Sequence, residues 1–475
     1  MSKAKTQENV SVENIYKLDG RVPVSKAIPF GLQHVLAMFV ANLAPVVLVL
    51  GVAVIGPEKR AFTAVETAQV LQSAMFAAGV ATTVQLYPIW KIGAKLPIVM
   101  GCSFTFLAAM QTIASTQGYE TLVGAIIVGG CIEGTLGLTA KYWRKYVGPV
   151  VSASVVMAIG LSLLAVGMDS FGGSKYNPEF GSPLNLCVAM VTLLTCLIYK
   201  RVVKGVWRNI DVLVGLGVGY VLSVILTVTG ISPLVDFSAF SETIEQLGWI
   251  NIPLPVFMRG ITPVFDVGAI ASMTIVFLVS AAETIGGTAA VAMDGLGREV
   301  TEREVQGSLG VDGFGSAFSG LFGACPVTSF NQNIGLIAMT GVVNRFTILM
   351  GSLILILASL FPPIGAFFNT IPDPVLGGCM ILMYGSIVFS GVKMIAACGD
   401  TERNMTIVSL AFCIGVGVTQ LGSYVADGVA VQYSIFNYFP SMFAQVFNGN
   451  AVAGVFVVSL LLDLILPGRN EKAEN

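Results

Sequence analysis

The sequence is poor in charged residues. Asp, Glu, Lys and Arg make up 11% of its 475 residues, whereas a soluble globular protein contains about 25%. So few charges cannot cover a water-facing surface, and 55% of the residues are hydrophobic. Long apolar runs recur from Ala27 to the C-terminus. The sequence therefore predicts an all-α polytopic membrane protein. It does not predict a membrane β-barrel, which would show short alternating segments.

Histidine is rarer still, and the cysteines show no pattern of chemical use. His34 is the single histidine, and the eight cysteines lie in or beside apolar runs without metal-ligand spacing. They are interpreted as small buried hydrophobic residues. We therefore expect no disulfide framework, metal site or cofactor, and an integral-membrane enzyme would have few groups for catalysis. Residues 1–26 lack the apolar core of a signal peptide, and no basic tract indicates nucleic-acid binding.

At about 20 apolar residues per span, the apolar runs predict about fourteen transmembrane segments. The predicted spans of the first half are 27–53, 66–88, 95–112, 120–140, 147–168, 183–199 and 210–230. Those of the second half are 264–292, 306–322, 326–342, 346–369, 374–396, 404–421 and 447–467. Between the halves, Ser238–Trp249 is amphipathic.

The lysines and arginines give this set of spans an orientation. If the N-terminus is cytoplasmic and the spans alternate, 21 of the 25 basic residues fall on the inner side. This asymmetry is what the positive-inside rule expects. Both termini are then cytoplasmic, and seven spans per half give the two halves opposite orientations. The chain is thus predicted to contain two inverted repeats of seven spans.

A polar stretch interrupts the predicted tenth span. Pro326 precedes three adjacent amides, Asn331 to Asn333, at hydrocarbon depth, where irregular backbone must line protein or a watery cavity. A shift of 229 residues places Pro97 of the third span on Pro326. Paired interruptions of this kind mark binding sites in transporters. We expect a short strand-like break in spans 3 and 10, with helices resuming near Phe104 and Asn333. The alternative is a polar loop between two spans.

Ionisable residues inside spans usually mark a substrate or ion path. Glu283 lies deep in the eighth span among small residues, and Asp312 lies in the ninth. Either carboxylate could bind and release a proton, and the alternative for Glu283 is a fixed polar cluster. Gln332 can donate and accept hydrogen bonds while ionised Glu283 only accepts. Together they suit a planar heterocycle with adjacent N–H and C=O groups.

The other intramembrane polar residues are less informative. A lone histidine such as His34 is more often a hydrogen-bonded packing residue than a titrating one. Asp211 and Asp266 lie near span ends, where water reaches them. Glu133 and Asp463 fit either a functional or a structural role.

The sequence resembles the nucleobase–ascorbate transporter family, also called nucleobase:cation symporter-2. The resemblance rests on Gln332-Asn333-Ile334-Gly335 followed by Thr340-Gly341, and on matches around Glu283, around Asp312 and in Gly31–Met38. It implies a core domain of spans 1–4 and 8–11 and a gate domain of spans 5–7 and 12–14. The corresponding boundaries are 1–26 (cytoplasmic tail), 27–140 (core), 141–262 (gate and connecting loop), 263–369 (core), 370–468 (gate) and 469–475 (cytoplasmic tail).

The resemblance also implies roles for individual residues. Those matching substrate-binding positions are Glu283, Gln332, Phe104, Asn331 and Ser103. Those matching positions for proton coupling or transport are Glu283, Asp312 and His34. Those matching positions that shape the site are Asn333, Gly335, Thr340 and Gly341. Gly287 departs from the family pattern, because relatives often carry Asp or His four residues after the glutamate.

The function implied is import of a purine nucleobase, xanthine or uric acid, by proton symport. Gln332 with Thr340-Gly341 resembles the xanthine and urate branch of the family. The resemblance further implies an elevator-like motion of core against gate, a homodimer, and a bacterial inner (plasma) membrane. The alternatives are a uracil or broad nucleobase permease, or an anion transporter with the same inverted seven-span fold.

Overall fold

The computed structural model describes residues 10–175, 177–420, 423–426, 429–432, 438, 447 and 450–467. The α-helices of the first half are α1 (Val24–Leu50), α2 (Ala64–Leu86), α3 (Leu107–Thr116), α4 (Tyr119–Leu138), α5 (Ala140–Trp143), α6 (Pro149–Phe171), α7 (Pro183–Val202), α8 (Asp211–Val228) and α9 (Ser238–Leu247). Those of the second half are α10 (Val267–Ala290), α11 (Glu302–Leu321), α12 (Asn331–Thr340), α13 (Arg345–Ala358), α14 (Pro362–Asn369), α15 (Asp373–Ala397), α16 (Glu402–Gln420) and α18 (Ala451–Ile465).

Shorter elements connect these helices. The 3₁₀-helices are η1 (Val12–Tyr16), η2 (Phe104–Phe106), η3 (Arg144–Tyr146), η4 (Gly205–Ile210) and η5 (Val256–Arg259), and α10 continues as a π-helix, η6 (Val291–Gly295). The strands are β1 (Val54–Ile55), β2 (Arg60–Ala61), β3 (Met100–Cys102), β4 (Val327–Ser329), β5 (Ser423–Ala426) and β6 (Val429–Gln432). They form three antiparallel pairs, β1 with β2, β3 with β4 and β5 with β6.

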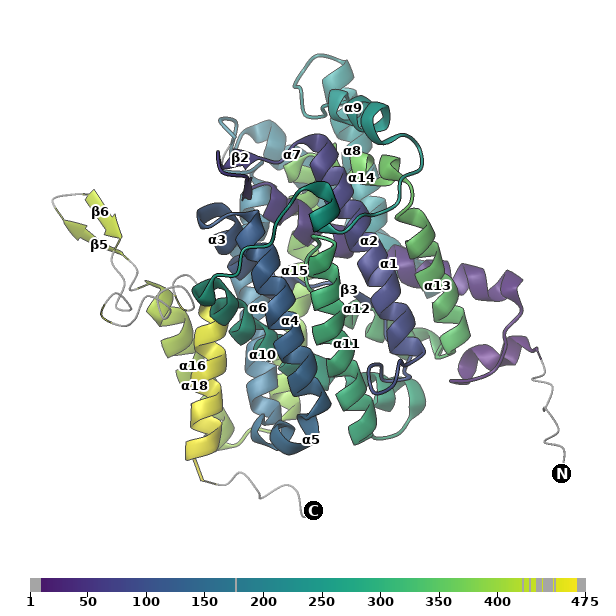
Figure 1. The fold of residues 1–475 in the computed structure, drawn as a ribbon, viewed down its shortest axis with the longest axis vertical. Coiled ribbons are helices and arrows are strands. Elements are labelled where there is room, and N and C mark those ends of the chain that lie inside the picture. Colours follow the sequence, from purple (N-terminus) through teal and green to yellow (C-terminus); the bar gives the residue numbers. More distant parts are fainter. Residues whose placement is uncertain are drawn as a thin grey trace.

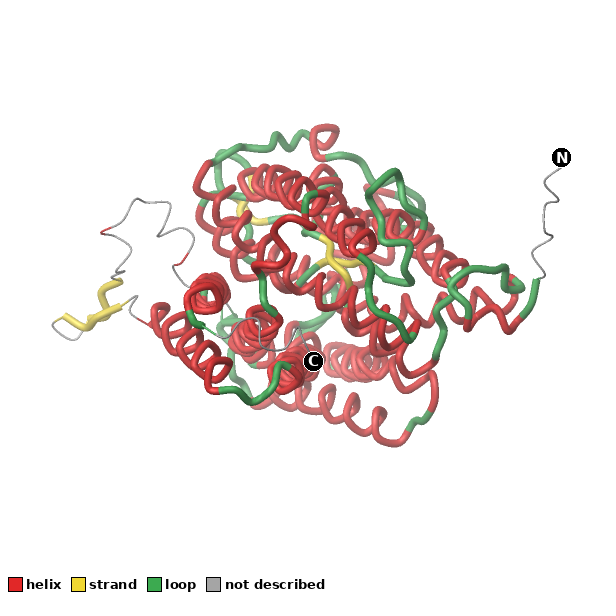
Figure 2. Tube along the Cα trace, turned by 90° about the horizontal axis from the view of Figure 1, so that it is seen from below, coloured by secondary structure: helices red, strands yellow, loops and turns green. Residues whose placement is uncertain are grey.

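Helices from the two halves of the chain pack against each other along most of their length. Figure 1 shows the long helices running roughly parallel, with α4 beside α11 and α1 beside α13. On the other side of the bundle, α6 packs against α15 and α16 against α18. Figure 2, which looks along the helices, shows the β3–β4 pair inside the bundle. The two strands are thus shielded from lipid by helices.

The helices agree with the predicted spans in position, but fewer of them are strongly apolar. Within the described part of the chain, seven helices are long and apolar enough to cross a membrane, or eight if α13 and α14 count as one bent span. Helices α2 and α11 are outside this set although they lie at predicted spans. Their glycine, serine and threonine residues are largely buried against other helices. The total of fourteen spans stays a prediction.

The predicted span 346–369 is present but sharply bent, which was not predicted. It consists of two helices, α13 and α14, that meet at an angle of 80°. Helix α14 begins with Pro362 and Pro363. Proline has no N–H to donate and is favoured in the first turn of a helix, so the pair starts a new helix instead of continuing α13.

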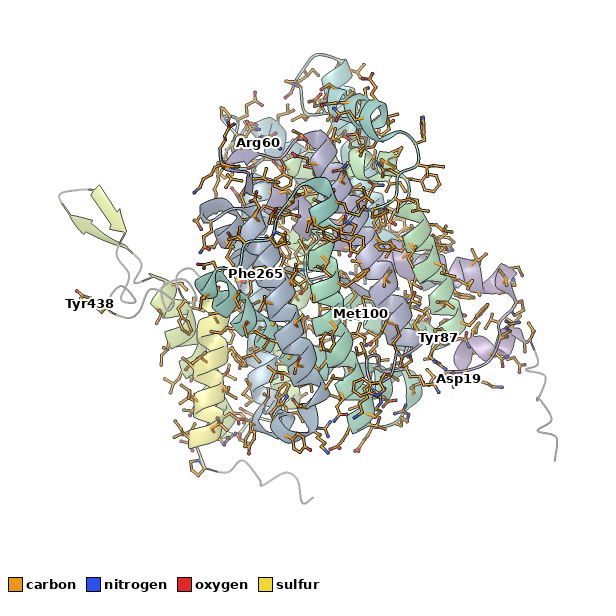
Figure 3. The ribbon with its side chains drawn as sticks, in the orientation of Figure 1. Asp19, Arg60, Tyr87, Met100, Phe265 and Tyr438 are labelled. Atoms are coloured by element: carbon orange, nitrogen blue, oxygen red, sulfur yellow. The ribbon has the colours of Figure 1, made fainter. Side chains whose placement is uncertain are left out.

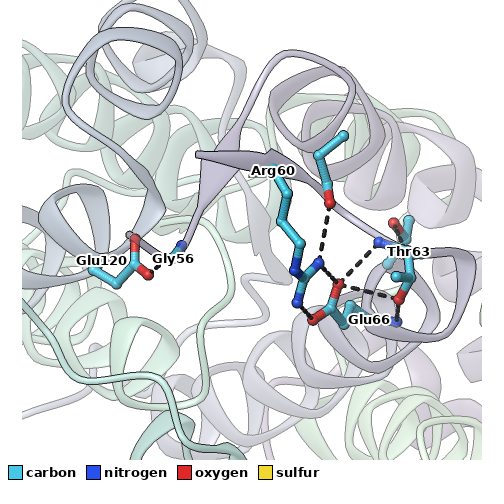
Figure 4. A network of polar contacts seen from close by, with 7 residues as sticks. Gly56, Arg60, Thr63, Glu66 and Glu120 are labelled. Atoms are coloured by element: carbon cyan, nitrogen blue, oxygen red, sulfur yellow. Dashed lines mark hydrogen bonds and ion pairs between the residues drawn. The ribbon is translucent and has the colours of Figure 1, made fainter. Parts of the chain in front are cut away.

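The end of the β1–β2 hairpin is fastened to the start of α2 (Figure 4). Thr63 and Glu66 form a reciprocal capping box, which satisfies N–H groups that the first helical turn leaves free. Arg60 adds two hydrogen bonds to Glu66, at 2.8 and 2.6 Å. Glu120 at the start of α4 accepts from the Gly56 N–H at 2.8 Å. One polar network therefore ties the hairpin to both helices.

Residues 10–22, here called the N-terminal strap, lie against the junction between α12 and α13. The Asn344 side-chain amide donates to the backbone oxygens of Asn14, Lys17 and Gly20 at 3.0 to 3.1 Å. Arg345 pairs with Asp19 and stacks over the Tyr87 ring. Asp19 and Tyr87 are labelled close together in Figure 3. The sequence predicted this segment as part of a tail, and the structure shows that residues 10–22 are docked.

We expect Asn344→Ala to release this strap. The substitution removes the three hydrogen bonds and the N-cap of α13, where Asn344 Oδ1 accepts from the Thr347 N–H at 3.0 Å. Loss of an N-cap alone costs about 1 kcal/mol. Limited trypsin digestion should then cut faster after the exposed residues Lys17 and Arg21.

Asn404→Ala is the matched control, because Asn404 also ties a helix start to the preceding loop through the Cys398 and Gly399 oxygens. It should lower the melting temperature without speeding cleavage in the strap. Equal cleavage rates in both variants would contradict the docking role of Asn344.

Candidate functional site

The two strands predicted in spans 3 and 10 are present and pair with each other. Met100 lies opposite Ser329, Gly101 opposite Thr328 and Cys102 opposite Val327. All six residues are buried. Met100, labelled in Figure 3, lies near the middle of the molecule. Segments 229 residues apart in the chain thus meet at the centre of the bundle.

An isolated two-stranded ribbon is at best marginally stable, and side chains of the surrounding helices satisfy its outer edges. On the β3 edge, Thr82 Oγ1 accepts from the Met100 N–H at 2.9 Å. Asn42 Oδ1 accepts from the Cys102 N–H at 2.8 Å. On the β4 edge, Ser316 Oγ accepts from the Val327 N–H and donates to its carbonyl oxygen, both at 3.0 Å. Helices α1, α2 and α11 therefore hold the ribbon in place.

A short helix follows each strand, so two helix N-termini begin beside the ribbon. After β3, the chain enters η2 at Phe104, where the sequence predicted it, and continues as α3. Ser103 caps η2 by accepting from the Thr105 N–H at 3.2 Å. After β4, α12 begins at Asn331, two residues before the predicted start at Asn333. Free N–H groups and the helix dipole make such ends attractive to carbonyl oxygens and anions.

Glu283 faces the first of these helix ends. Its Oε2 accepts from the Thr105 hydroxyl at 2.8 Å, and its side chain is half-buried in α10. The contact connects residues 178 positions apart. The structure therefore brings a carboxylate of the eighth predicted span to the break in the third.

Asp312 of α11 is linked to the ribbon through Thr328. Its Oδ2 accepts from the Thr328 hydroxyl at 3.0 Å and from the hydroxyl of Thr284, the residue after Glu283. Asp312 is fully buried. Thr284 and Thr328 also lie 3.2 Å apart between their hydroxyl oxygens. Thr328 thus connects Asp312 to β4, and Thr284 connects it to α10 next to Glu283. Sequence reasoning did not identify these threonines.

His34 takes part in a buried contact with α12. The Asn333 side-chain amide donates to the His34 carbonyl oxygen at 3.0 Å and lies 3.2 Å from its Nδ1. Both side chains are almost fully buried. This arrangement matches the packing role that a lone histidine suggests. Asn333 thus holds the start of α12 against α1.

An aromatic contact reaches from the ribbon to α15. The ring of Phe104 meets that of Tyr384 edge to face, with 5.2 Å between centroids. Tyr384 is fully buried, and its hydroxyl has no hydrogen-bond partner among the described residues. Sequence reasoning missed Tyr384, since a tyrosine in an apolar span carries no distinguishing signal.

The predicted motif residues divide into two groups. Asn331 and Gln332 occupy the first turn of α12, but their side chains lie outside the described residues. Gly335 is exposed, with open space around it. Thr340 accepts from the Val342 N–H at 3.2 Å, and Gly341 ends α12 with a left-handed φ of 69°. Thr340 and Gly341 thus terminate the helix.

Most of the remaining buried acids have a positively charged partner. Asp211 pairs with Lys200 at 3.3 Å, and Asp463 pairs with Arg403 at 2.8 Å. Asp266 caps α10 by accepting from the Ala269 N–H at 2.8 Å. Glu133 is buried in α4 with no hydrogen-bond partner among the described residues. Within the described part of the chain, no cluster of three acidic, histidine or cysteine side chains could hold a metal ion.

Comparison with known sequences identifies relatives along the whole chain. Residues 25–423 match the family model Xan_ur_permease, described as a permease family. The uric acid permease PucK of Bacillus subtilis is 33% identical over 82% of this chain and 86% of its own length. The xanthine permease of Bacillus subtilis is 30% identical over 92% and 93% of the two chains. The xanthine permease XanP of Escherichia coli is 29% identical over 98% and 96%.

Solved structures show the same fold at low sequence identity. The transmembrane domain of the cyanobacterial bicarbonate transporter BicA aligns over 92% of this chain and 97% of its own, with a TM-score of 0.54 and 14% identity. The murine anion transporter Slc26a9 aligns over 95% and 70%, with a TM-score of 0.62 and 10% identity. At these identities the matches show that the fold is shared, and they do not indicate which substrate this chain binds.

The paired strands, the buried carboxylates and the sequence relatives all indicate a multi-pass plasma-membrane permease and not an enzyme. The chain belongs to the Xan_ur_permease family, the nucleobase:cation symporter-2 family that its sequence resembles.

Proposed function

We propose that the chain is a proton-coupled symporter that imports a purine nucleobase, xanthine or uric acid. The observation that carries the proposal is the position of Glu283, whose carboxylate meets Thr105 where the helix after β3 begins. A carboxylate accepts hydrogen bonds from ring N–H groups, whereas the free N–H groups of a helix end donate to carbonyl oxygens. A purine dione presents both kinds of group on one rim.

The relatives support the choice of substrate. The relatives that are about 30% identical to this chain are called xanthine permeases or uric acid permeases. Phe104, against Tyr384, offers an aromatic ring beside the ribbon for stacking a planar base. Gln332, at the start of α12, is proposed to bond the base through its side-chain amide, and Asn331 and Ser103 complete the substrate contacts.

Transport is proposed to move a core domain against a gate domain. The core would comprise residues 27–140 and 263–369, and the gate residues 141–262 and 370–468. The contact between Phe104 and Tyr384 then crosses the boundary between them. Asp312 and Glu283 supply the proton-binding groups. We further propose a homodimer through the gate in a bacterial plasma membrane, with both termini cytoplasmic.

Uptake of labelled xanthine into cells that express the chain tests this proposal. Uptake should fall when a protonophore collapses the proton gradient, and unlabelled uric acid should compete while uracil should not. Undiminished uptake with the protonophore would contradict proton coupling. Competition by uracil but not by uric acid would favour the alternative of a uracil or broad nucleobase permease.

The charges of this site do not suit an anion transporter, although solved structures of a bicarbonate transporter and an anion transporter share the fold. Glu283 and Asp312 are both connected to the β3–β4 region through threonine hydroxyls. Like charges at short range repel by several kcal/mol in a medium of low polarity. An inorganic anion would therefore be disfavoured beside two carboxylates, whereas a base with N–H groups would be attracted.

A further inference from the structure

Glu133 differs from the other buried acids of this chain. Among the described residues, four acids are buried, and three of them are partnered: Asp211 by Lys200, Asp463 by Arg403 and Asp312 by two threonines. Glu133 is 2% exposed, and neither of its oxygens accepts a hydrogen bond from a described residue. A buried carboxylate without a partner is costly when ionised. The neutral, protonated form of Glu133 is therefore favoured.

Helical spacing shows where the Glu133 side chain points. A methyl group added to Gly129, one turn earlier, would lie 2.6 Å from the Phe277 ring of α10. One added to Gly137, one turn later, would lie 2.8 Å from Leu309 of α11. Residues four apart share one face of a helix. Glu133 thus points into the seam where α4 meets α10 and α11.

Asp312 lies in the same seam. Helices α4 and α11 approach most closely at Gly134 and Gly313, where an added methyl group on Gly313 would lie 2.0 Å from the Gly134 nitrogen. Glu133 and Asp312 are the residues immediately before these two glycines, so both carboxyl groups belong to the closely packed part of this seam. Asp312 Oδ1 accepts no hydrogen bond from the residues that the structure describes. The charged group that faces Asp312 from α10 is Glu283.

Apolar residues separate the pair from one end of the seam. Ala140, Ala281, Val305 and Leu309 form a buried cluster there, with Trp143 packed against it. The described residues contribute no ion pair to either carboxyl group. Two carboxylates that share a site without a cation cannot both be ionised easily, so one of them retains a proton.

We propose that Glu133 and Asp312 form a proton-binding pair that shares one proton. The two hydroxyl donors on Asp312 Oδ2 favour its ionised form, which leaves the proton on Glu133. When the surroundings of Asp312 change, a water molecule between the two carboxyl groups relays the proton: it takes the proton from Glu133 and gives one of its own to Asp312 Oδ1. One O–H bond breaks and one forms at each step, the water is regenerated, and the negative charge passes from Asp312 to Glu133. The role of this pair in coupling rests on the proposed function, whereas its shared proton does not.

Infrared spectroscopy of the purified protein tests the shared proton directly. The wild type at neutral pH should show the carbonyl stretch of a protonated carboxylic acid, and Glu133→Gln should remove that band. Asp312→Asn should shift the band, because the partner of the acid changes. Thr135→Val, on the exposed face of the same helix, should leave it unchanged. A wild-type band that persists in Glu133→Gln would overturn the proposal.

Transport in liposomes tests the role of the pair in coupling. In Glu133→Gln, the fold loss of gradient-driven xanthine accumulation should be at least about ten times the fold loss of xanthine exchange. A factor of about ten is the accumulation that a gradient of one pH unit can drive. Glu133→Asp, which keeps a titratable group, should recover part of this loss. Equal losses of exchange and accumulation in Glu133→Gln would overturn the coupling role.

The two measurements separate the two proposals. If the wild type transports no nucleobase, the proposed function fails, while the infrared band still decides whether the pair shares a proton. If Glu133→Gln does not assemble, the comparison of wild type with Asp312→Asn and Glu133→Asp decides it. Accumulation that follows a sodium gradient, without an infrared band, would identify a cation site and overturn the proton pair.

Discussion

Replacing Glu283 by glutamine is expected to reduce xanthine uptake by about 30-fold or more. Removing one partner of a buried, charge-assisted hydrogen bond costs about 2 to 5 kcal/mol, and 2 kcal/mol corresponds to about 30-fold in affinity. Glutamine keeps the size of the side chain, and its amide oxygen can still accept from Thr105. The loss therefore reports the charge of Glu283. Uptake of labelled xanthine, normalised to the amount of protein in the membrane, measures it.

Two variants separate this effect from a general disturbance. Glu242→Gln makes the same change on the exposed surface of α9 and should leave uptake unchanged. Thr105→Val removes the 2.8 Å hydrogen bond to Glu283 but leaves the carboxylate, so its loss should be smaller. A Glu283→Gln variant that transports like the wild type would rule out this carboxylate as the substrate contact.

The centre of the fold could be predicted from the sequence because its signals repeat. Pro97 and Pro326 interrupt two apolar segments, and the distribution of basic residues placed these segments in oppositely oriented halves. Together they predicted one break in each half. The structure contains both breaks, as β3 and β4, and pairs them with each other, which was not predicted. Glu283 and Asp312 were found for a related reason, since a carboxylate in an apolar run is conspicuous.

The partners of these carboxylates could not be predicted, because they are common residues brought together by packing. Thr105, Thr284 and Thr328 come from three elements, and threonine also occurs in helices away from the site, such as α7 and α8. The docking of the N-terminal strap could not be predicted for the same reason. Its backbone oxygens accept hydrogen bonds from Asn344, which lies more than 300 positions away in the sequence. The bend between α13 and α14 was missed because both sides of it are apolar.

Gly101 is a position in the β3–β4 ribbon where substitution should be poorly tolerated. It lies in β3 opposite Thr328. A methyl group there would lie 2.6 Å from the Phe330 ring, 2.7 Å from the end of Met38 and 2.9 Å from Asn42 Oδ1. Phe330 precedes α12, and Asn42 holds the β3 edge at Cys102. Relief of the clash must therefore displace the ribbon or the start of α12.

We expect Gly101→Ala to destabilise the protein by about 1 to 3 kcal/mol, the usual cost of an overpacked core, and to reduce xanthine binding further than this cost explains. The reason is that the displaced groups position the two helix ends beside the ribbon, and Glu283 contacts the first of these ends. Thermal unfolding in detergent measures the first effect and equilibrium binding of xanthine the second.

Gly217→Ala is the control, because a methyl group on that exposed position of α8 meets nothing within 4 Å. It should leave both quantities unchanged, since alanine is at least as favourable as glycine inside a helix. If Gly101→Ala bound xanthine normally, the ribbon would not set the geometry of the site.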